Sequence, residues 1–235
     1  MGQIHVAGSI NIDITVQVNQ RPRLGETVIG QRINFTLGGK GANQAIAATR
    51  LGSSVRMIGS VGADDFGRRA LESLESEDIS LEFVSQVSDT STGMALITVD
   101  ATSENTVIVI PGCNMTLSEK DVRSPSIGSE DIAVSQFEIP QSTVRAFFET
   151  AKQSGATTVL NPAPANELHD STATLVDYLI INETEAVFYS GLDENPPLSR
   201  DRLIETCQKL RTFRDQTIII TLGGDGLLAS TPSET

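Results

Sequence analysis

The chain has 235 residues, a formal net charge of −13 and 39% hydrophobic residues. This length and composition are typical of a globular chain that buries a sizeable core. The negative charge argues against nucleic-acid and anionic-membrane partners, because phosphate groups are bound by clustered Lys and Arg. The N-terminus carries no basic leader followed by an apolar segment, and no apolar run reaches about eighteen residues. We therefore predict a cytoplasmic protein.

The first part of the chain contains several segments with β-strand patterns. Ile4–Ser9 is a short apolar run, and residues 11–18 alternate polar and apolar side chains, as in a strand with one wet face. Residues 28–36 and 93–110 also read as β-structure, the latter with a turn near Ser103. We expect these segments, apart from the first, to form a small sheet of their own.

Strands and helices alternate through the rest of the chain. Helices are predicted over Lys40–Leu51, around residues 66–74, over 142–154 and around 203–210. Strands are predicted at 54–60, 132–135, 157–160, 178–181 and 216–222, and a surface loop at 193–197. This alternation predicts the α/β class: three α/β/α layers with a mostly parallel central sheet, plus the small β-sheet, in a single domain spanning residues 1–235.

The stretch Gly38-Gly39-Lys40-Gly41-Ala42-Asn43 leads into a predicted helix. Glycines at a helix start allow backbone N–H groups to approach a polar ligand closely. Lys40 and Asn43 lie about one turn apart and can face the same ligand. The stretch is not a Walker A loop, because no Ser or Thr follows the lysine. A glycine turn before a helix is the alternative interpretation.

Asn11 and Asp13 lie on one face of the early alternating strand. A carboxylate can accept from two adjacent hydroxyls, and an amide both donates and accepts. Such a pair suits a polyhydroxylated ligand, although the solvated face of an amphipathic strand explains it as well.

Several polar motifs follow predicted strands, where α/β sheets place their ligands. Asn182 and Glu185 follow the strand at 178–181 and could serve either as a helix N-cap with a first-turn acid or as a water-mediated metal–phosphate site. Thr221–Gly226 could form a flat surface under a nucleotide or a hairpin turn. Glu138 also lies just after a strand, before Pro140.

These motifs, in this order, resemble the PfkB family of carbohydrate kinases, most closely its ribokinase branch. The resemblance covers essentially the whole chain. It is carried by residues 8–13, 22–27, 38–44, 62–67, 91–93, 161–165, 182–185 and 221–226.

The resemblance implies an ATP-dependent kinase that phosphorylates the 5-hydroxyl of D-ribose, using Mg²⁺ and a monovalent cation (K⁺). The implied sugar-binding residues are Asn11, Asp13, Gly39, Lys40, Gly41, Asn43 and Glu138. The implied ATP-binding residues are Asn182, Thr221, Leu222, Gly223, Gly224, Asp225 and Gly226, with Glu185 acting indirectly on magnesium and phosphate. Strands at about 11–18, 28–36 and 93–110 would form a β lid that closes over the sugar and can pair with a second subunit.

One family motif does not occur in these 235 residues. The family takes its catalytic base and anion hole from a Gly-Ala-Gly-Asp segment at a helix N-terminus, which also flanks the K⁺ site, and no such segment precedes Thr235. We therefore assign no catalytic residue within this chain and expect weak kinase activity from it. We also expect Ile218, Ile220 and Leu222 of the strand at 216–222 to be partly uncovered, because the helices that would cover that side of the sheet are missing from these residues. Kinases for deoxyribose or a keto-sugar acid, and a non-catalytic sugar-binding remnant, remain alternatives.

Overall fold

The computed structural model describes residues 2–191 and 199–231, so the loop predicted at 193–197 lies outside the described residues. The chain divides into two compact units, which are described separately. Unit 1 comprises Met1–Ala7, Ser118–Phe137 and Gln141–Thr235; unit 2 comprises Gly8–Leu117 and Glu138–Pro140. A single domain over residues 1–235 therefore stays a prediction. In the described part of the chain, no helix is long and apolar enough to cross a membrane.

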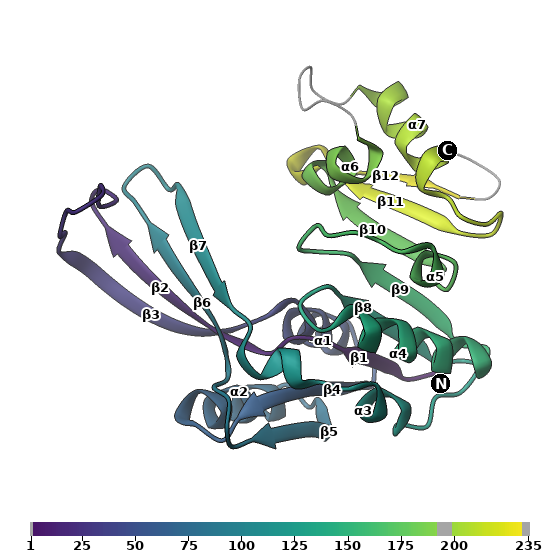
Figure 1. Ribbon diagram of the computed structural model, residues 1–235, viewed down its shortest axis with the longest axis horizontal. Coiled ribbons are helices and arrows are strands. Elements are labelled where there is room, and N and C mark those ends of the chain that lie inside the picture. The colour runs from purple at the N-terminus through teal and green to yellow at the C-terminus, as the bar shows by residue number, and fades with distance from the viewer. Residues whose placement is uncertain (1, 192–198, 232–235) are drawn as a thin grey trace. The chain divides into compact units, whose positions relative to one another are not determined.

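Unit 1 is built on a mostly parallel sheet (Figure 1). Its strands lie in the order β12 (Leu227–Ser230), β11 (Thr217–Thr221), β10 (Tyr178–Asn182), β9 (Thr157–Asn161), β8 (Ile132–Gln136) and β1 (Ile4–Ala7). All neighbours are parallel except β12, which pairs antiparallel with β11. The carboxyl ends of β9, β10 and β11 therefore share one edge.

Helices connect the parallel strands of unit 1. They are α3 (Glu119–Arg123), α4 (Gln141–Gln153), α5 (Asp170–Ala173), α6 (Glu183–Ser190) and α7 (Arg200–Leu210). From β8 to β11 each connection advances one strand in the same direction. Because such crossovers are right-handed, α4 to α7 fall on one side of the sheet. Leu179, Ile181, Ile218 and Ile220 on that side are fully buried.

The opposite face of this sheet is less covered within unit 1. Val159, Ile180 and Ile219 are only partly buried, and the strand register places them on one face. The expectation that Ile218, Ile220 and Leu222 are partly uncovered is wrong for Ile218 and Ile220, since α6 and α7 pack on their side. Leu222 is only partly buried.

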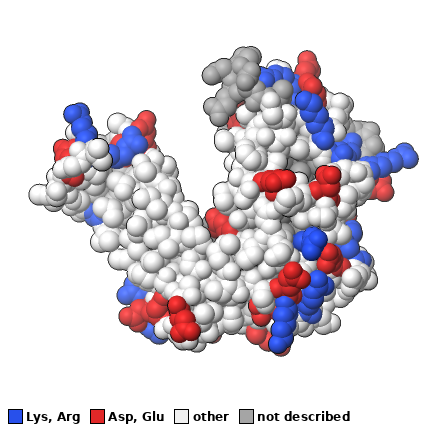
Figure 2. Space-filling model, in the orientation of Figure 1, with Lys and Arg blue, Asp and Glu red and all other residues white. Residues whose placement is uncertain are grey.

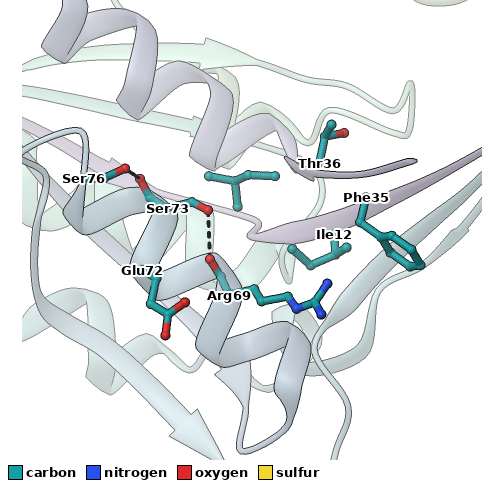
Figure 3. Close-up of a pocket in the computed structure, with 8 residues that line it drawn as sticks. Ile12, Phe35, Thr36, Arg69, Glu72, Ser73 and Ser76 are labelled. Carbon is teal, nitrogen blue, oxygen red and sulfur yellow. Dashed lines mark hydrogen bonds between the residues drawn. The ribbon is translucent and has the colours of Figure 1, made fainter. Parts of the chain in front are cut away.

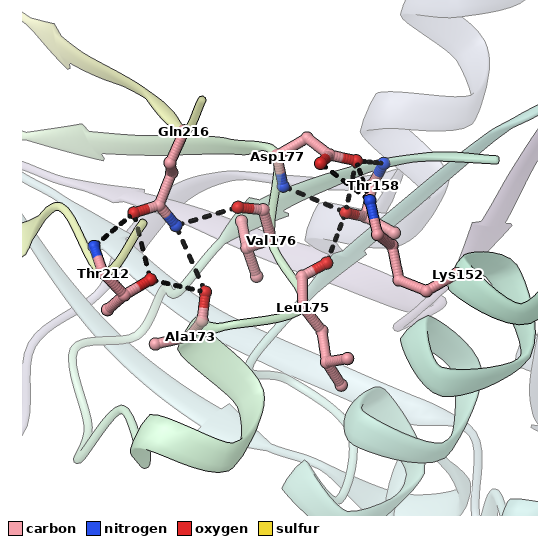
Figure 4. A network of polar contacts seen from close by, with 8 residues as sticks. All are labelled: Lys152, Thr158, Ala173, Leu175, Val176, Asp177, Thr212 and Gln216. Atoms are coloured by element: carbon pink, nitrogen blue, oxygen red, sulfur yellow. Dashed lines mark hydrogen bonds and ion pairs between the residues drawn. The ribbon is translucent and has the colours of Figure 1, made fainter. Parts of the chain in front are cut away.

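A polar network holds the amino ends of β9, β10 and β11 (Figure 4). The buried Gln216 side chain donates to the carbonyl oxygens of Val176 at 2.8 Å and Ala173 at 3.2 Å. Asp177 accepts from the Lys152 ammonium at 2.8 Å. The network satisfies backbone groups that would otherwise be buried without partners.

Unit 2 contains the small sheet, with strand order β3 (Gly30–Gly38), β2 (Asn11–Val18), β6 (Gly93–Val99) and β7 (Asn105–Ile110). It also contains α1 (Lys40–Arg50), β4 (Val55–Gly62), α2 (Asp65–Glu75), β5 (Ser80–Val87) and the short 3-10 helix η1 (Gly112–Thr116). The parallel pair β4–β5 is flanked by α1 and α2. Mostly parallel strands, flanking helices and a smaller sheet confirm the predicted α/β class.

The two faces of the small sheet differ in polarity. Asn11 and Asp13 lie opposite Gly38 and Thr36 on one face. Residues on the other face are mainly aliphatic or aromatic, among them Ile12, Ile14, Ile33, Phe35, Leu96, Ile108 and Ile110. The alternation read from residues 11–18 is confirmed.

Asp64 joins the base of the small sheet to α2. Its carboxylate accepts from the backbone N–H of Gly67 at 2.7 Å, which caps α2, and from the N–H and hydroxyl of Thr92 at 2.9 and 2.7 Å. Burial alone would raise the pKa of Asp64, but these hydrogen bonds outweigh it and lower the pKa. The hydrogen bonds of Asp64 thus connect the motifs 62–67 and 91–93 at the start of β6.

Candidate functional site

Asp13 stands on the polar face of the small sheet against a glycine. A Cβ atom at Gly38 would come within 2.2 Å of the Asp13 carboxylate, so a side chain there would displace the carboxylate from this position. Burial raises the pKa of Asp13, and the nearby negative charge of Glu138 raises it further. Two carboxylates that repel one another are well suited to accept hydroxyl hydrogens from a neutral polyol.

Glu138 holds the start of α1. Its Oε2 accepts from the Ser9 hydroxyl at 2.5 Å and from the Lys40 N–H at 3.0 Å. The Ser9 hydroxyl in turn accepts from the Gly41 N–H at 3.2 Å. This chain of contacts brings three separate sequence motifs together.

The glycines at the start of α1 allow close packing. Gly39 has φ of 87°, and a Cβ at Gly41 would come within 2.6 Å of the Ser9 nitrogen. The N–H groups of Lys40, Gly41 and Ala42 all donate within the protein. These N–H groups therefore have partners within the protein, and their contact with a ligand stays a prediction. The side chains of Lys40 and Asn43 remain available, and the roles of Gly39 and Gly41 in sugar binding stay predictions.

Two adjoining cavities of unit 2 lie away from these residues. The first, of about 330 Å³, is lined by Ile12, Phe35, Arg69 and Ser73 on the apolar side of β2 (Figure 3). The second, of about 560 Å³, shares Phe35 and Arg69 and adds Met94. Neither contains a predicted sugar-binding residue, since Asn11 and Asp13 point to the other face.

Asn182 and Glu185 form a capping box at the start of α6. The Asn182 Oδ1 accepts from the Glu185 N–H at 2.8 Å, and the Glu185 Oε2 accepts from the Asn182 N–H at 2.9 Å. The helix-cap alternative is therefore confirmed, and a role in ATP binding stays a prediction for Asn182.

The fit of this region to magnesium is limited. Glu185 is buried and uses one carboxylate oxygen in the cap. Within residues 2–191 and 199–231, no group of three or more His, Cys, Asp or Glu side chains could hold a metal ion. Direct metal ligation is not supported; an indirect, water-mediated contact of Glu185 stays a prediction.

The segment Thr221–Gly226 forms the turn of the β11–β12 hairpin. Leu222 N–H donates to the Gly226 carbonyl at 2.8 Å, and the hairpin alternative is confirmed by the antiparallel pairing. Gly223, Gly224 and Gly226 have nothing within 4 Å of a Cβ placed on them. The turn is open, so a flat ligand could approach its backbone.

Tyr189, a residue that the sequence did not single out, anchors the loop after β9. Its hydroxyl lies 3.0 Å from the Pro162 carbonyl and 2.8 Å from the Asn166 carbonyl. Burial raises the pKa of Tyr189 to about 12. No local signal in the sequence could have indicated this role, because the two contacts span 27 and 23 residues.

The predicted sugar-binding residues all belong to unit 2, and the predicted nucleotide-binding residues all belong to unit 1. Asp13, Glu138 and the start of α1 are brought together in unit 2. In unit 1, Asn182 and Thr221 are direct neighbours across β10 and β11.

Comparison with known proteins identifies the family. The model of the pfkB family of carbohydrate kinases matches residues 1–235. A ribokinase of Haemophilus influenzae is 38% identical over 230 residues, covering 96% of this chain and 73% of the relative. A deoxyribokinase of Salmonella typhi is 36% identical over 228 residues, covering 96% of this chain and 74% of the relative.

Solved structures agree with this assignment. Arabidopsis thaliana ribokinase complexed with ribose and ATP matches with a TM-score of 0.84 and 26% identity, covering 100% of this chain and 77% of that structure. A Cryptococcus neoformans ribokinase in complex with ADP matches with a TM-score of 0.81 and 29% identity, covering 100% of this chain and 77% of that structure. The chain belongs to the pfkB family of carbohydrate kinases.

Proposed function

We propose that this chain acts as a ribokinase, binding the sugar and the nucleotide for transfer of the γ-phosphoryl group of ATP to the 5-hydroxyl of D-ribose. The observation that carries the proposal is the cluster of Asp13, Glu138 and the start of α1 in unit 2. Ribokinase relatives at 33–38% identity support the choice of ribose.

The residues of the chain would act by binding and positioning. Asp13 and Glu138 would accept hydrogen bonds from ribose hydroxyls, while Asn11, Lys40 and Asn43 would donate to its oxygens. Asn182 and the open Thr221–Gly226 turn would hold ATP at the carboxyl ends of β10 and β11. Phosphoryl transfer depends mostly on such positioning and on charge stabilisation.

Magnesium would supply charge neutralisation on the phosphates when bound with ATP. For this chain we propose only that Glu185 influences it through water. The requirement for K⁺ and the cytoplasmic location are retained as predictions.

A kinase for deoxyribose is the second candidate, because deoxyribokinases are 36% identical to this chain. Titration calorimetry with D-ribose, 2-deoxy-D-ribose and D-fructose separates the candidates. We expect D-ribose to bind at least about tenfold more tightly than 2-deoxy-D-ribose, because a site built to bind a hydroxyl rejects the analogue that lacks it. Equal or reversed affinities would favour the deoxyribose kinase, and no binding of any sugar would contradict the proposal.

We further propose that the apolar face of the small sheet pairs with a second copy of the chain. Ile33, Phe35, Leu96 and Ile108 on that face are 54%, 45%, 40% and 59% exposed. All six residues of the edge strand β7 are exposed. Figure 2 shows charged side chains gathered at the tip of the small sheet and an uncharged stretch between the tip and the base. Exposed apolar patches and free strand edges are typical of interaction surfaces.

Sedimentation velocity tests this pairing. The chain is expected to sediment as a dimer and Ile108→Asp as a monomer, because a carboxylate in the apolar interface would be desolvated. Leu51→Asp, at an exposed leucine after α1, is the matched control and should leave the dimer intact. A monomeric wild-type chain at about 50 μM, well above typical dimer constants, would refute the pairing.

A further inference from the structure

Asn114 is a buried residue of η1 that contacts the strand carrying Asn11. It is 1% exposed and lies 103 residues from Asn11 in sequence. Its Oδ1 accepts from the Ile10 N–H at 2.9 Å, and its Nδ2 donates to the Asn11 Oδ1 at 2.7 Å. No motif in the sequence pointed to this residue.

The direction of both hydrogen bonds is fixed by chemistry. A backbone N–H can only donate, so Asn114 must turn its oxygen toward Ile10. The Asn114 NH₂ group then faces Asn11, and since an NH₂ group only donates, Asn11 must present its oxygen. The amide of Asn11 therefore has one defined orientation, with its own NH₂ group directed away from Asn114.

The Asn11 NH₂ group is left available. Asn11 is 3% exposed, and its Nδ2 makes no hydrogen bond to any residue that the structure describes. The side chain projects from the same face of β2 as Asp13. Among the described residues, Asn11 Nδ2 is not one of the fully buried side-chain atoms without a partner. Water or a ligand can therefore reach this donor and satisfy it.

Gly93 leaves the space in which the side-chain amides of Asn11 and Asn114 come into contact. It lies directly opposite Asn11 on β6, and a Cβ there would come within 2.2 Å of Asn11 Oδ1 and 2.3 Å of Asn114 Nδ2. Any side chain at position 93 would push the pair apart.

We propose that Asn114 is a positioning residue that holds Asn11 as a hydrogen-bond donor to a sugar oxygen. The site thereby offers a fixed donor, Asn11 Nδ2, beside a fixed acceptor, the Asp13 carboxylate. Neighbouring hydroxyls of one sugar satisfy both groups, because a hydroxyl can accept as well as donate. The inference rests on the proposed sugar site and adds how its polarity is set.

A double-mutant cycle on D-ribose affinity tests the proposal. Asn114→Ala frees the Asn11 amide to rotate, so the binding-competent orientation is only partly populated and ribose should bind about three- to tenfold more weakly. In the Asn11→Ala background the same change should cost less than about twofold, because its target is gone. An equal loss in both backgrounds would show a merely structural role and overturn the proposal.

A second measurement needs no variant. In nuclear magnetic resonance spectra of the unmodified chain, saturating D-ribose should shift the Asn11 Nδ2 proton signals and leave those of Asn114 nearly unmoved. Unmoved Asn11 signals would overturn the inference. Wild-type binding of ribose, lost in Asp13→Ala, is measured first; if wild-type binding is absent, the proposed function itself has failed.

Discussion

The Asp13 carboxylate has a raised pKa because it is partly buried and lies near the negative charge of Glu138. If it accepts hydrogen bonds from ribose, protonation removes that acceptor. Ribose affinity should therefore fall as the pH falls through the raised pKa, with a midpoint above about 4, the ordinary value for an aspartate.

Calorimetric titrations across a pH series check this dependence. Glu138→Gln removes the neighbouring charge, and a single amide oxygen can still accept from Ser9 and Lys40, as the Oε2 atom does. The midpoint should then move to lower pH. Asp89→Asn, at an exposed position, serves as control and should leave the midpoint unchanged. Affinity that stays constant down to about pH 4 would exclude Asp13 as the acceptor.

At the scale of single residues, the sequence predicted which residues share a face of a strand better than which distant residues they contact. The face shared by Asn11 and Asp13 follows from the two-residue period of a strand. Contacts of Asn11 with Asn114 and of Ser9 with Glu138 span more than a hundred residues, and no local pattern encodes them. The same holds for Gly38, whose approach to Asp13 depends on the pairing of β2 with β3.

Two substitutions at Glu185 can separate its structural role in the cap of α6 from its proposed role near magnesium. Glu185→Gln keeps an oxygen that accepts from the Asn182 N–H, so the melting temperature should change little. Glu185→Ala removes that acceptor and should destabilise the chain by about 1 kcal/mol.

The Mg²⁺ dependence of ATP binding distinguishes the roles. If the charge of Glu185 orients hydrated magnesium, Glu185→Gln should raise the Mg²⁺ concentration needed for half-maximal ATP binding, without loss of ribose affinity. Should Glu185→Gln bind Mg²⁺–ATP like the wild type while Glu185→Ala is less stable, Glu185 is a capping residue alone.

Elements were predictable where periodicity or caps were strong. β2, α1 and β10 follow the predicted bounds within one or two residues. β5 was not predicted, because Ser80–Val87 mixes polar and apolar residues with incomplete alternation. The glycines before α1 marked the helix start correctly, and the structure adds that Gly41 packs closely on Ser9 and donates its N–H to the Ser9 hydroxyl.

At the scale of the whole molecule, the order of strands and helices predicted the fold class. It did not predict which residues of the central sheet the helices cover. Ile218 and Ile220 were expected to be partly uncovered for lack of helices on their side, but α6 and α7 contact β11 and both residues are fully buried. Only the packing of α6 and α7 identifies the covered side.

Residues 1–235 are expected to phosphorylate ribose slowly, because they contain no Gly-Ala-Gly-Asp segment. A missing general base commonly lowers the rate by about 10² to 10⁴. Formation of ribose 5-phosphate should be measured with ATP beside the Haemophilus influenzae ribokinase, which is 38% identical. Comparable turnover from both proteins would mean that a residue within this chain acts as the base.

The central claim is that unit 2 binds a sugar through Asp13, and calorimetric titration of the chain with D-ribose tests it most directly. The account predicts saturable binding by the wild-type chain and at least about a hundredfold loss in Asp13→Ala, because the hydroxyls lose a charged acceptor. Affinity for ATP, whose proposed residues lie in unit 1, should stay within about twofold. Equal ribose affinity of the two chains, both shown to be folded by circular dichroism, would contradict the account.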